Sequence, residues 1–334
     1  CGNLSESRDV FESMVERDLI CWNALISCYI QEVNGQSALK CFKCMHSEVI
    51  SPDVVTLVCI LNSCGSVGAL EKGKQLHEMI VTGGLFGKII AIGNALVDMY
   101  AKCGNLEKAQ KVLEDLPFRD VISWNSLISG YAQHGQGHEA LNCFETMKSE
   151  GFSPNAITFT GILKACGSIG ADKKGKEIHA KVMNEDWLER NVLVGTALMD
   201  MYSKCGALGK AQGVFDLLQV RDVVCWTALI TGYALHGHGI EALKLLRQMR
   251  KEHVSPNVVT FICILKACSS IGSLGMGETI HAEIKKRGLL LTERNVVLGT
   301  ALVDMYAKCG AVAKARDVLK ELPHRDVIAW NALI

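Results

Sequence analysis

The feature that most constrains the fold is a long internal repeat. The segment VISWNSLISGYAQHGQGHEAL at residues 121–141 returns in similar form as VVCWTALITGYALHGHGIEAL at residues 223–243. Four tryptophans mark the period, at separations of 102, 102 and 104 residues: Trp22, Trp124, Trp226 and Trp330. Self-similarity at a fixed period is typical of repeat arrays, so the chain is expected to fold by stacking similar units.

Each period is expected to subdivide, because no common helical repeat is this long. Trp22, Leu25, Ile26 and Tyr29 have the i, i+3, i+4, i+7 spacing of the buried face of an amphipathic helix. The first period contains five more such stripes, in residues 38–45, 57–64, 73–80, 96–103 and 109–116. Six helices per period pair into three helical hairpins.

Residues that end helices fall between these stripes. Glycine favours a left-handed C-cap, and Gly104, Gly206 and Gly310 each follow a stripe. Proline lacks the N–H that a helix interior needs, and all five prolines lie between stripes: Pro52, Pro117, Pro154, Pro256 and Pro323. An amphipathic hairpin cannot bury its apolar face alone. The predicted fold is therefore all-α, an α-solenoid or right-handed superhelix of stacked helix-turn-helix hairpins with an extended concave surface.

Composition argues against several other classes. The 15 cysteines recur with the period, which favours buried free thiols in a reducing compartment over a disulfide framework. No uncharged run of about 18 apolar residues is present, so no membrane span is expected. The formal net charge of +0 is unusual for a nucleic-acid-binding protein. Cys1 falls inside a recurring pattern, so we expect a fragment of a longer array, from which a targeting segment could have been lost.

Three kinds of segment in rotation resemble a known family. They are WNALISGY-like openings, KACGSIGADKKGKEIHA and ALVDMYAKCGNLEKAQKVLEDLPFRD, in units of 35, 36 and 31 residues. This order resembles the pentatricopeptide repeat (PPR) proteins, specifically the plant organellar class that alternates ordinary, long and short repeats. The resemblance covers the whole chain. The single period of about 34 residues in tetratricopeptide repeats does not fit.

The resemblance divides the chain, as one continuous solenoid domain, into repeats of three types. The expected ordinary repeats are 19–53, 121–155 and 223–257, with a partial one at 327–334. The expected long repeats are 54–89, 156–191 and 258–295, the last of which carries the two extra residues of the third period. The expected short repeats are 90–120, 192–222 and 296–326, preceded by a partial one at 1–18.

The resemblance implies binding of single-stranded RNA, one base per repeat, by two or three side chains. One base-reading residue lies near the start of the first helix and the other is the last residue of the repeat. Small amides, hydroxyls and carboxylates differ in donors and acceptors, so a pair can discriminate among bases. The repeated tryptophan belongs to the core, whereas Asn125 and Thr227, which follow it, differ because each would read a base.

The family's pairing rules then give a predicted target, 5′-U-N-U-Y-N-G-A-N-G-3′, in which the fifth base has a weak preference for A. U is implied by Asn23 with Asp53 and by Asn94 with Asp120, a pyrimidine (C favoured) by Asn125 with Asn155, G by Thr196 with Asp222 and by Thr300 with Asp326, and A by Thr227 with Asn257. Weaker base-reading residues are Thr160, Asn191 and Asn331. Val58 and Ile262 have no polar group and are not expected to discriminate.

The second residue of each repeat is expected to pack against the faces of the bases. All of these residues are apolar: Ile20, Val55, Ala91, Ile122, Ile157, Leu193, Val224, Val259, Val297 and Ile328.

Two alternatives remain open at this point. Asn, Thr and Asp at helix starts, such as Asp120, Asp222 and Asp326, could simply cap helices and complement the helix dipole. The chain could also be a helical-repeat scaffold for protein–protein interaction. The six complete ordinary and short repeats use only Asn or Thr paired with Asp or Asn, and this restriction favours RNA.

No catalytic chemistry is expected from these residues. Some proteins of this class end in a zinc deaminase-like domain, marked by H-x-E and P-C-x-x-C. The nearest matches here, His46 with Glu48, His281 with Glu283, and Cys41 with Cys44, lie inside repeat helices. We therefore predict a non-enzyme without cofactor, metal, small-molecule substrate or membrane contact, although a deaminase-like domain could follow in the full-length protein.

The recurring histidines are expected to serve the core. His77, His179 and His281 each lie on a packed stripe, which favours a hydrogen-bonded core role. The resemblance further implies the recognition array of an organellar RNA editing or processing factor, in a mitochondrion or chloroplast, with RNA-editing proteins as candidate partners.

Overall fold

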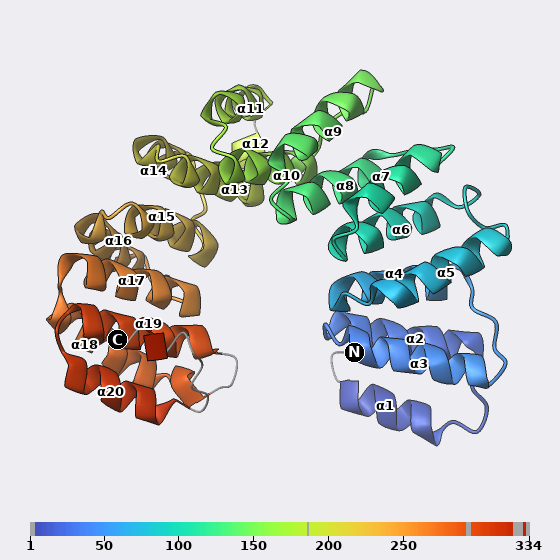
Figure 1. The fold of residues 1–334 in the computed structure, drawn as a ribbon, viewed down its shortest axis with the longest axis horizontal. Coiled ribbons are helices and arrows are strands. Elements are labelled where there is room, and N and C mark those ends of the chain that lie inside the picture. The colour runs from blue at the N-terminus through green and yellow to red at the C-terminus, as the bar shows by residue number, and fades with distance from the viewer. Residues whose placement is uncertain (1–3, 186, 292–294, 323–329, 332–334) are drawn as a thin grey trace. The chain divides into compact units, whose positions relative to one another are not determined.

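The structure is a computed structural model that describes residues 4–185, 187–291, 295–322 and 330–331. Every regular element within these ranges is a helix, which confirms the all-α prediction. The chain separates into two compact units, Cys1–Ala165 and Cys166–Ile334 (Figure 1). No helix of the described residues combines the length and the apolar character needed to cross a bilayer.

The first unit is a stack of antiparallel hairpins. Its first helices α2, α4, α6 and α8 pack one on the next, and each also packs on its hairpin partner, α3, α5, α7 or α9. The helices are α1 (Leu4–Ser13), α2 (Leu19–Gln31), α3 (Gly35–Ser47), α4 (Val54–Val67), α5 (Leu70–Thr82), α6 (Ile90–Lys102), α7 (Leu106–Asp115), α8 (Val121–Gln133) and α9 (Gly137–Ser149). Helix α10 (Ala156–Ser168) contains the boundary between the units.

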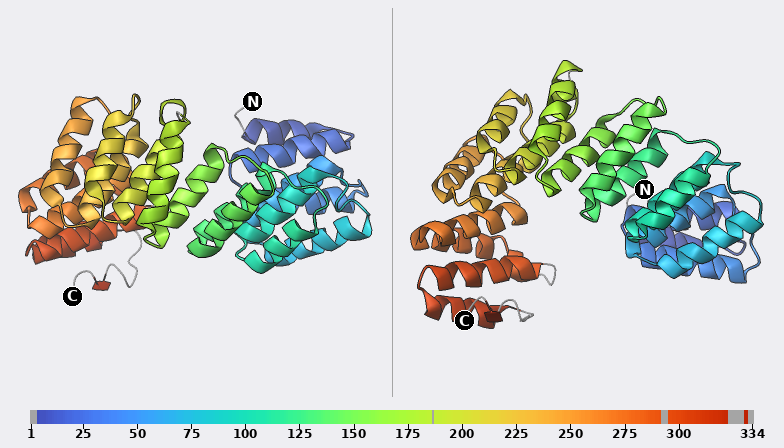
Figure 2. Two further views of the ribbon diagram at one scale, coloured as in Figure 1. Left: turned by 90° about the horizontal axis from the view of Figure 1, so that it is seen from above. Right: turned by 45° about the horizontal axis from the view of Figure 1, so that its top comes forward.

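The second unit repeats this arrangement, with α13, α15, α17 and α19 packed in sequence (Figure 2). Its elements are α11 (Asp172–Asn184), α12 (Trp187–Arg190), α13 (Val192–Lys204), α14 (Leu208–Leu217), α15 (Val223–Leu235), α16 (Gly239–Lys251), α17 (Val258–Ile271), α18 (Leu274–Lys286), the 3₁₀ helix η1 (Leu289–Leu291), α19 (Val296–Lys308) and α20 (Val312–Glu321). The hairpin pattern did not predict α12 or η1. Helix α12 lies between α11 and α13, and η1 lies between α18 and α19. In both places a long repeat was expected to end.

A buried aromatic pair occurs twice, two periods apart. Trp22 meets Phe11 edge-to-face at a ring-centroid separation of 4.7 Å, and Trp226 meets Phe215 at 4.6 Å. These tryptophans lie on the stripe predicted to be buried, and their partners come from the last helix of the preceding hairpin, α1 or α14. Edge-to-face packing adds to the free energy of burial, so these contacts fasten one hairpin to the next.

The recurring histidines join two helices of successive hairpins. Nδ1 of His77 lies 2.9 Å from the Tyr100 hydroxyl oxygen, His179 lies 2.8 Å from that of Tyr202, and His281 repeats the contact. Burial lowers the pKa of all three imidazoles. The predicted hydrogen-bonded role is present, with each histidine half-buried between a second helix and the following first helix.

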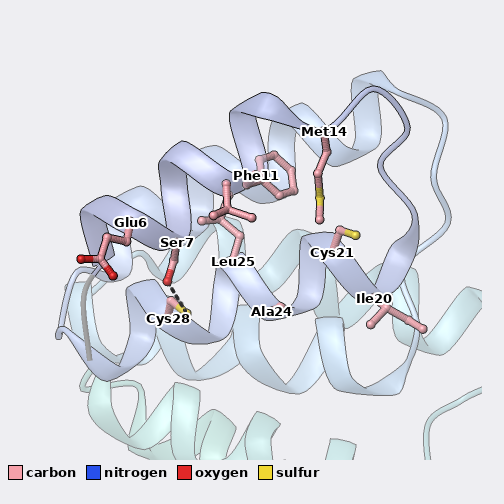
Figure 3. A pocket seen from close by; sticks show the side chains of 10 residues that line it. Glu6, Ser7, Phe11, Met14, Ile20, Cys21, Ala24, Leu25 and Cys28 are labelled. Atoms are coloured by element: carbon pink, nitrogen blue, oxygen red, sulfur yellow. Dashed lines mark hydrogen bonds between the residues drawn. The ribbon is translucent and has the colours of Figure 1, made fainter. Parts of the chain in front are cut away.

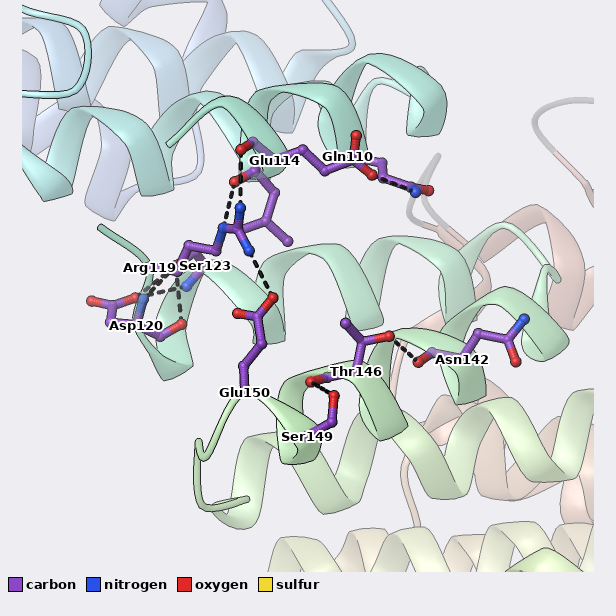
Figure 4. Close-up of polar contacts among 10 residues, drawn as sticks. Gln110, Glu114, Arg119, Asp120, Ser123, Asn142, Thr146, Ser149 and Glu150 are labelled. Atoms are coloured by element: carbon purple, nitrogen blue, oxygen red, sulfur yellow. Dashed lines mark hydrogen bonds and ion pairs between the residues drawn. The ribbon is translucent and has the colours of Figure 1, made fainter. Parts of the chain in front are cut away.

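An arginine ties the end of α7 to the end of α9 (Figure 4). Arg119 donates from Nε to the Leu113 carbonyl at 3.0 Å and from Nη2 to the Glu114 carbonyl at 3.0 Å. Its Nη1 donates to Glu150 at 2.7 Å. The last carbonyls of a helix lack intrahelical partners, and Arg119 satisfies two of them. Arg17 and Arg221 hold the equivalent places one period away on either side.

The described cysteines are free thiols, as the periodic pattern predicted. Burial raises the pKa of Cys64 and Cys268 to about 12, so neither is a reactive thiolate near neutral pH.

Among the described residues, Val33, Val49 and His253 adopt left-handed backbone at helix ends without being glycine. Val49 gives a stability prediction. Val49 has φ of 60°, whereas Gly151 occupies the equivalent place one period later with φ of 88°. A β-branched side chain in this region costs roughly 1–2 kcal/mol. Because the Val49 side chain is exposed, removing it sacrifices little packing energy.

We therefore expect Val49→Gly to raise the free energy of unfolding by about 1 kcal/mol, since glycine also loses some entropy on folding. Urea denaturation followed by circular dichroism measures the change. The reverse exchange at the equivalent site, Gly151→Val, is expected to destabilise the chain. A Val49→Gly variant less stable than the parent would contradict the strain argument.

Candidate nucleic-acid interface

The last residue of each expected ordinary repeat is the N-cap of the next helix. The Asp53 side chain accepts a hydrogen bond from the Thr56 backbone N–H at 2.8 Å, and Asn257 accepts one from Thr260 at 2.8 Å. In the short repeats, Asp120 caps α8 through Ser123 (Figure 4) and Asp222 caps α15. The capping alternative is therefore a real structural role of these residues.

Capping does not prevent pairing with the other predicted base-reading residue. Asn23 donates from Nδ2 to Asp53 Oδ1 at 3.1 Å, and Asn94 donates to both carboxylate oxygens of Asp120 at 3.2 Å. Asn125 donates to Asn155 Oδ1 at 3.1 Å. The structure therefore brings the two members of these three pairs into contact, and their reading of bases stays a prediction.

The capping bonds also fix the charge of Asp53. Burial tends to raise the pKa of this carboxyl, but the hydrogen bonds from Thr56 and Asn23 outweigh it and hold the pKa below its usual value. Asp53 is therefore an anion, and thus an acceptor, near neutral pH.

The threonine pairs are arranged differently. Thr196 donates to the Val192 carbonyl of its own helix at 2.9 Å, and Thr300 donates to Val296 at 3.1 Å. In the described part of the chain Thr196 does not bond Asp222, and Asp326 lies outside the described residues. Thr227 lies 2.7 Å from the hydroxyl of Thr260, which in turn donates to Asn257 Oδ1 at 2.9 Å.

The weaker predicted residues do not form such pairs. Thr160 donates to the Ala156 carbonyl of its own helix at 2.8 Å. Asn191 caps α13 through the Leu193 N–H at 3.0 Å, and Asn331 is exposed. Val58 and Ile262 are apolar and half-buried.

The second residues of the repeats form a recurring set of exposed apolar side chains. Ile328 lies outside the described residues; the other nine are all exposed, and the eight larger than alanine range from 51% for Val224 to 75% for Ile20. Single exposed apolar side chains are ordinary on a protein surface. An exposed apolar side chain at the same position of successive repeats is not explained by core packing.

A pocket in the first unit brings together residues predicted to read a base and residues predicted to flank it. It has a volume of about 310 Å³ and lies between α6, α8 and the start of α10. Its lining includes Asn125 and Asn155, the pair predicted to read one base, together with Ile122 and Ile157, the apolar residues predicted to flank it. A lining that combines amide groups with apolar side chains suits a flat, polar-edged ligand.

A second pocket, of about 430 Å³, lies between α1 and α2 and is almost entirely apolar (Figure 3). Its residue Val10 is 58% exposed, whereas Val112, one period later, is 1% exposed where α6 packs on α7. The exposed face of α1 therefore matches the face of α7 that α6 covers one period later. The lining combines apolar side chains with Glu6 and Ser7 and contains no predicted base-reading residue.

Three recurring lysines form ion pairs within their own helices. On the first helices of the short repeats, Lys102 pairs with Asp98 at 2.7 Å and Lys204 with Asp200 at 2.7 Å. Lys308 repeats the pattern with Asp304. This pairing is consistent with the zero net charge of the chain.

The structure offers no metal centre among the residues it describes, since no three His, Cys, Asp or Glu side chains gather there. Cys41 and Cys44 lie on α3, and burial raises the pKa of Cys41 to about 11.

Sequence reasoning missed one set of residues next to the pairs. Thr56, Thr158 and Thr260 are the third residues of the long repeats, and their hydroxyls contact Asn23, Asn125 and Thr227. The sequence does contain a signal for these threonines, in the segments DVVT at 53–56, NAIT at 155–158 and NVVT at 257–260. In each, a Thr stands three residues after the N-cap and completes a capping-box pattern. What such a pattern cannot show is a contact with the preceding repeat.

Comparison with known proteins agrees with this architecture. A sequence model described as "PPR repeat family" matches residues 17–66, 119–168 and 221–270. A second, described as "PPR repeat", matches residues 94–121, 196–223 and 300–327. Together the two cover more than half of the chain.

Similar curated proteins come from Arabidopsis thaliana. Pentatricopeptide repeat-containing protein At4g18520, chloroplastic, is 38% identical over 334 residues, which are 100% of this chain and 53% of that protein. Pentatricopeptide repeat-containing protein At2g03380, mitochondrial, is 35% identical over 336 residues, 100% of this chain and 48% of that protein. The chain thus spans about half the length of these relatives.

A solved structure shares the fold. The crystal structure of the pentatricopeptide repeat protein PPR10 in complex with an 18-nt psaJ RNA element has a TM-score of 0.75 at 18% identity, covering 99% of this chain and 49% of that one. The crystal structure of the pentatricopeptide repeat protein PPR10 from maize has a TM-score of 0.60 at 17% identity, covering 99% of this chain and 58% of that one. The likeness supports the α-solenoid predicted from the repeat pattern.

Proposed function

The chain belongs to the pentatricopeptide repeat family, and from this premise we propose that it binds single-stranded RNA and reads bases one repeat at a time. The observation that carries the proposal is the pocket in which Asn125 and Asn155 are flanked by Ile122 and Ile157. PPR10, which has a similar fold, was crystallised with an 18-nt RNA element, and this supports the same class of ligand.

The capping geometry offers a physical basis for base choice. In Asp53 and Asn155 alike, the capping hydrogen bonds end on Oδ1. The remaining terminal atom is Oδ2 of an aspartate but Nδ2 of an asparagine. An acceptor suits U and G, whose central ring nitrogen on the pairing edge carries hydrogen. A donor suits C and A, whose equivalent nitrogen does not.

The other base-reading residue then separates small bases from large ones. Asparagine reaches further than threonine, so Asn23 and Asn125 favour a pyrimidine, while Thr196 and Thr227 leave room for a purine. Combined with the cap residue, this supports the predicted target 5′-U-N-U-Y-N-G-A-N-G-3′. Half-buried apolar Val58 and Ile262 support treating those long repeats as non-selective.

We further propose the division into ordinary, long and short repeats given above, with the chain as the recognition array of an RNA editing or processing factor. Each expected complete repeat starts at or next to the first residue of a helix, for example Val54, Ile90 and Val121. Relatives named chloroplastic and mitochondrial support placement in one of these organelles.

Selection from a random single-stranded RNA pool at moderate salt tests the proposal. Enrichment of U-N-U-Y-N-G-A-N-G is expected, and it would support register, polarity and pairing together. Binding without any enriched motif would contradict base reading. Absence of RNA binding would leave the fold intact and favour a protein-binding scaffold instead.

The exposed apolar residues give a second prediction. Ile122→Ala with Ile157→Ala is expected to weaken binding of the selected RNA by about tenfold, because the base loses apolar contact on both faces. The free energy of unfolding should change little, since both side chains are exposed. Fluorescence anisotropy measures the Kd. Ile240→Ala, at another exposed isoleucine outside the base-reading positions, is the matched control and should leave the Kd unchanged.

A further inference from the structure

A buried hydroxyl lies behind each ordinary-repeat pair. Thr56, Thr158 and Thr260 are each 0% exposed. Thr56 donates to Asn23 Oδ1 at 2.6 Å, and Thr158 donates to Asn125 Oδ1 at 2.6 Å. Thr260 lies 2.7 Å from the hydroxyl oxygen of Thr227. All three ordinary repeats therefore have a third polar side chain, supplied by the following repeat, in contact with the residue that faces the base.

We propose that this threonine is a positioning residue for base reading: it fixes the orientation of the base-reading side chain and so sharpens discrimination. The inference rests on the proposed function of these pairs. It adds a residue that makes no contact with RNA and acts through Asn23, Asn125 or Thr227.

The argument follows from the two ways in which a terminal amide can point. In the observed orientation Asn23 Oδ1 accepts from Thr56, and Nδ2 donates to Asp53 Oδ1. The second Nδ2 hydrogen is then left for the base. Rotated by half a turn, the amide would direct an oxygen at the Asp53 carboxylate and lose the bond from Thr56. The threonine thus helps to exclude an orientation that would present an acceptor to the base.

The chain contains a natural comparison with the same pair. Asn94 and Asp120 repeat the Asn–Asp combination in a short repeat, but the third residue there is Ser123. The Ser123 hydroxyl lies 3.0 Å from both the carbonyl oxygen and Oδ1 of Asp120, and it does not reach Asn94. Within the described residues, Asn94 Oδ1 is buried and has no hydrogen-bond partner.

The two repeats differ in the reach of this one hydroxyl. Both hydroxyls lie near their own cap residue, at 2.8 Å from Asp53 Oδ1 for Thr56 and 3.0 Å from Asp120 Oδ1 for Ser123, but only that of Thr56 also contacts the preceding base-reading residue. Threonine is β-branched and more restricted in side-chain rotation than serine, which favours a single hydroxyl position. Asn23 is therefore held by two neighbours and Asn94 by one. Discrimination in favour of U should be stronger at the base read by repeat 19–53 than at the base read by repeat 90–120.

Reciprocal substitutions test this. We expect Thr56→Val to lower the preference for U over C at the first target position by about three- to tenfold, the range for loss of one hydrogen bond. A turned Asn23 amide would present an acceptor, which suits the amino group of C better than a carbonyl oxygen of U, so this effect adds to the choice made by Asp53. The preference at the third position, read by Asn94 and Asp120, should be unchanged. Ser123→Thr should raise the preference at the third position and leave the first alone. Competition binding with the target RNA and single U-to-C variants measures each ratio, and Thr82→Val on α5 is the control.

The outcomes separate this inference from the proposed function. A parent chain without U preference at either position would contradict the base-reading function itself. A parent chain that prefers U, with unchanged ratios in both Thr56→Val and Ser123→Thr, would overturn only the role of the threonine. Thr56→Val also loses the capping-box bond from the Asp53 N–H, so its unfolding is measured first. If it does not fold, Thr56→Ser replaces it, and its ratio is expected to fall toward that of the Asn94 repeat.

Discussion

The double substitution Thr227→Asn with Asn257→Asp is expected to change the base preference of repeat 223–257 from A to U. The variant would reproduce the Asn23 and Asp53 pair of the equivalent repeat. Asp at position 257 presents an acceptor where Asn presents a donor, and Asn at 227 fills the space left by Thr. Thr260 already lies behind the pair, as Thr56 does behind Asn23, so the exchange should complete the same three-residue arrangement.

The expected effect is large because both determinants change together. One well-formed pair contributes roughly 1–3 kcal/mol of discrimination, or about 5- to 150-fold in affinity. The measurement is competition between target RNAs that differ only at the seventh base, A or U. The parent chain should prefer A and the variant U, with the other eight positions unaffected.

The chain supplies a matched control for this exchange. Thr160 and Asn191 are the same residue types in a long repeat, but Thr160 donates to its own helix and makes no relay to a cap residue. Thr160→Asn with Asn191→Asp should therefore change the preference at the fifth base little. An equal change at both sites, or none at 223–257, would contradict the assignment of Thr227 and Asn257 as the base-reading pair.

The fold was predictable because its core repeats. Trp22, Trp124 and Trp226 recur on a helical stripe, and buried stripes of this kind specify helix, hairpin and stack at once. The short helix α12 was not predictable, since no periodic pattern marks its four residues. The left-handed backbone of Val49 was also not predictable, because this conformation at a helix end is usually adopted by glycine and valine gives no signal for it.

The candidate site was predictable in its members but not in its hydrogen bonds. Sequence placed Asn125 and Asn155 in one pair, and the structure places them 3.1 Å apart in one pocket. It left capping and pairing as alternatives, whereas Asn155 does both with the same oxygen. It could not assign Thr158 to the site, because that contact joins residues 33 positions apart in different repeats.

The neutral charge is consistent with reading by shape and hydrogen bonds. Lys102 and Lys204 are each paired with an aspartate one helical turn away, and the formal net charge of the chain is +0. Affinity would then depend only weakly on salt. Contacts with the bases would then supply a large part of the binding free energy. For every variant above, the ratio of affinities for two bases is therefore a more sensitive readout than the total affinity.

The second large effect concerns stability and is expected to leave base preference intact. Trp226 is 0% exposed and packs edge-to-face on Phe215 at 4.6 Å. Trp226→Ala should lower the free energy of unfolding by about 3–5 kcal/mol, the usual cost of removing a buried aromatic side chain. Its indole N–H has no hydrogen-bond partner among the described residues, so the loss comes from packing alone.

Because a repeat array is stabilised by contacts between neighbours, unfolding should begin in the second unit, where Trp226 lies. Urea denaturation and hydrogen exchange measure the size and the place of the loss. Trp330→Ala, at a tryptophan that is 50% exposed, is the control and should change stability by about 0.5 kcal/mol or less. Where the variant still folds, it should select the same bases as the parent. A changed preference at the seventh base would mean that Trp226 orients Thr227, and core packing and base reading could then no longer be treated as separate properties of the repeat.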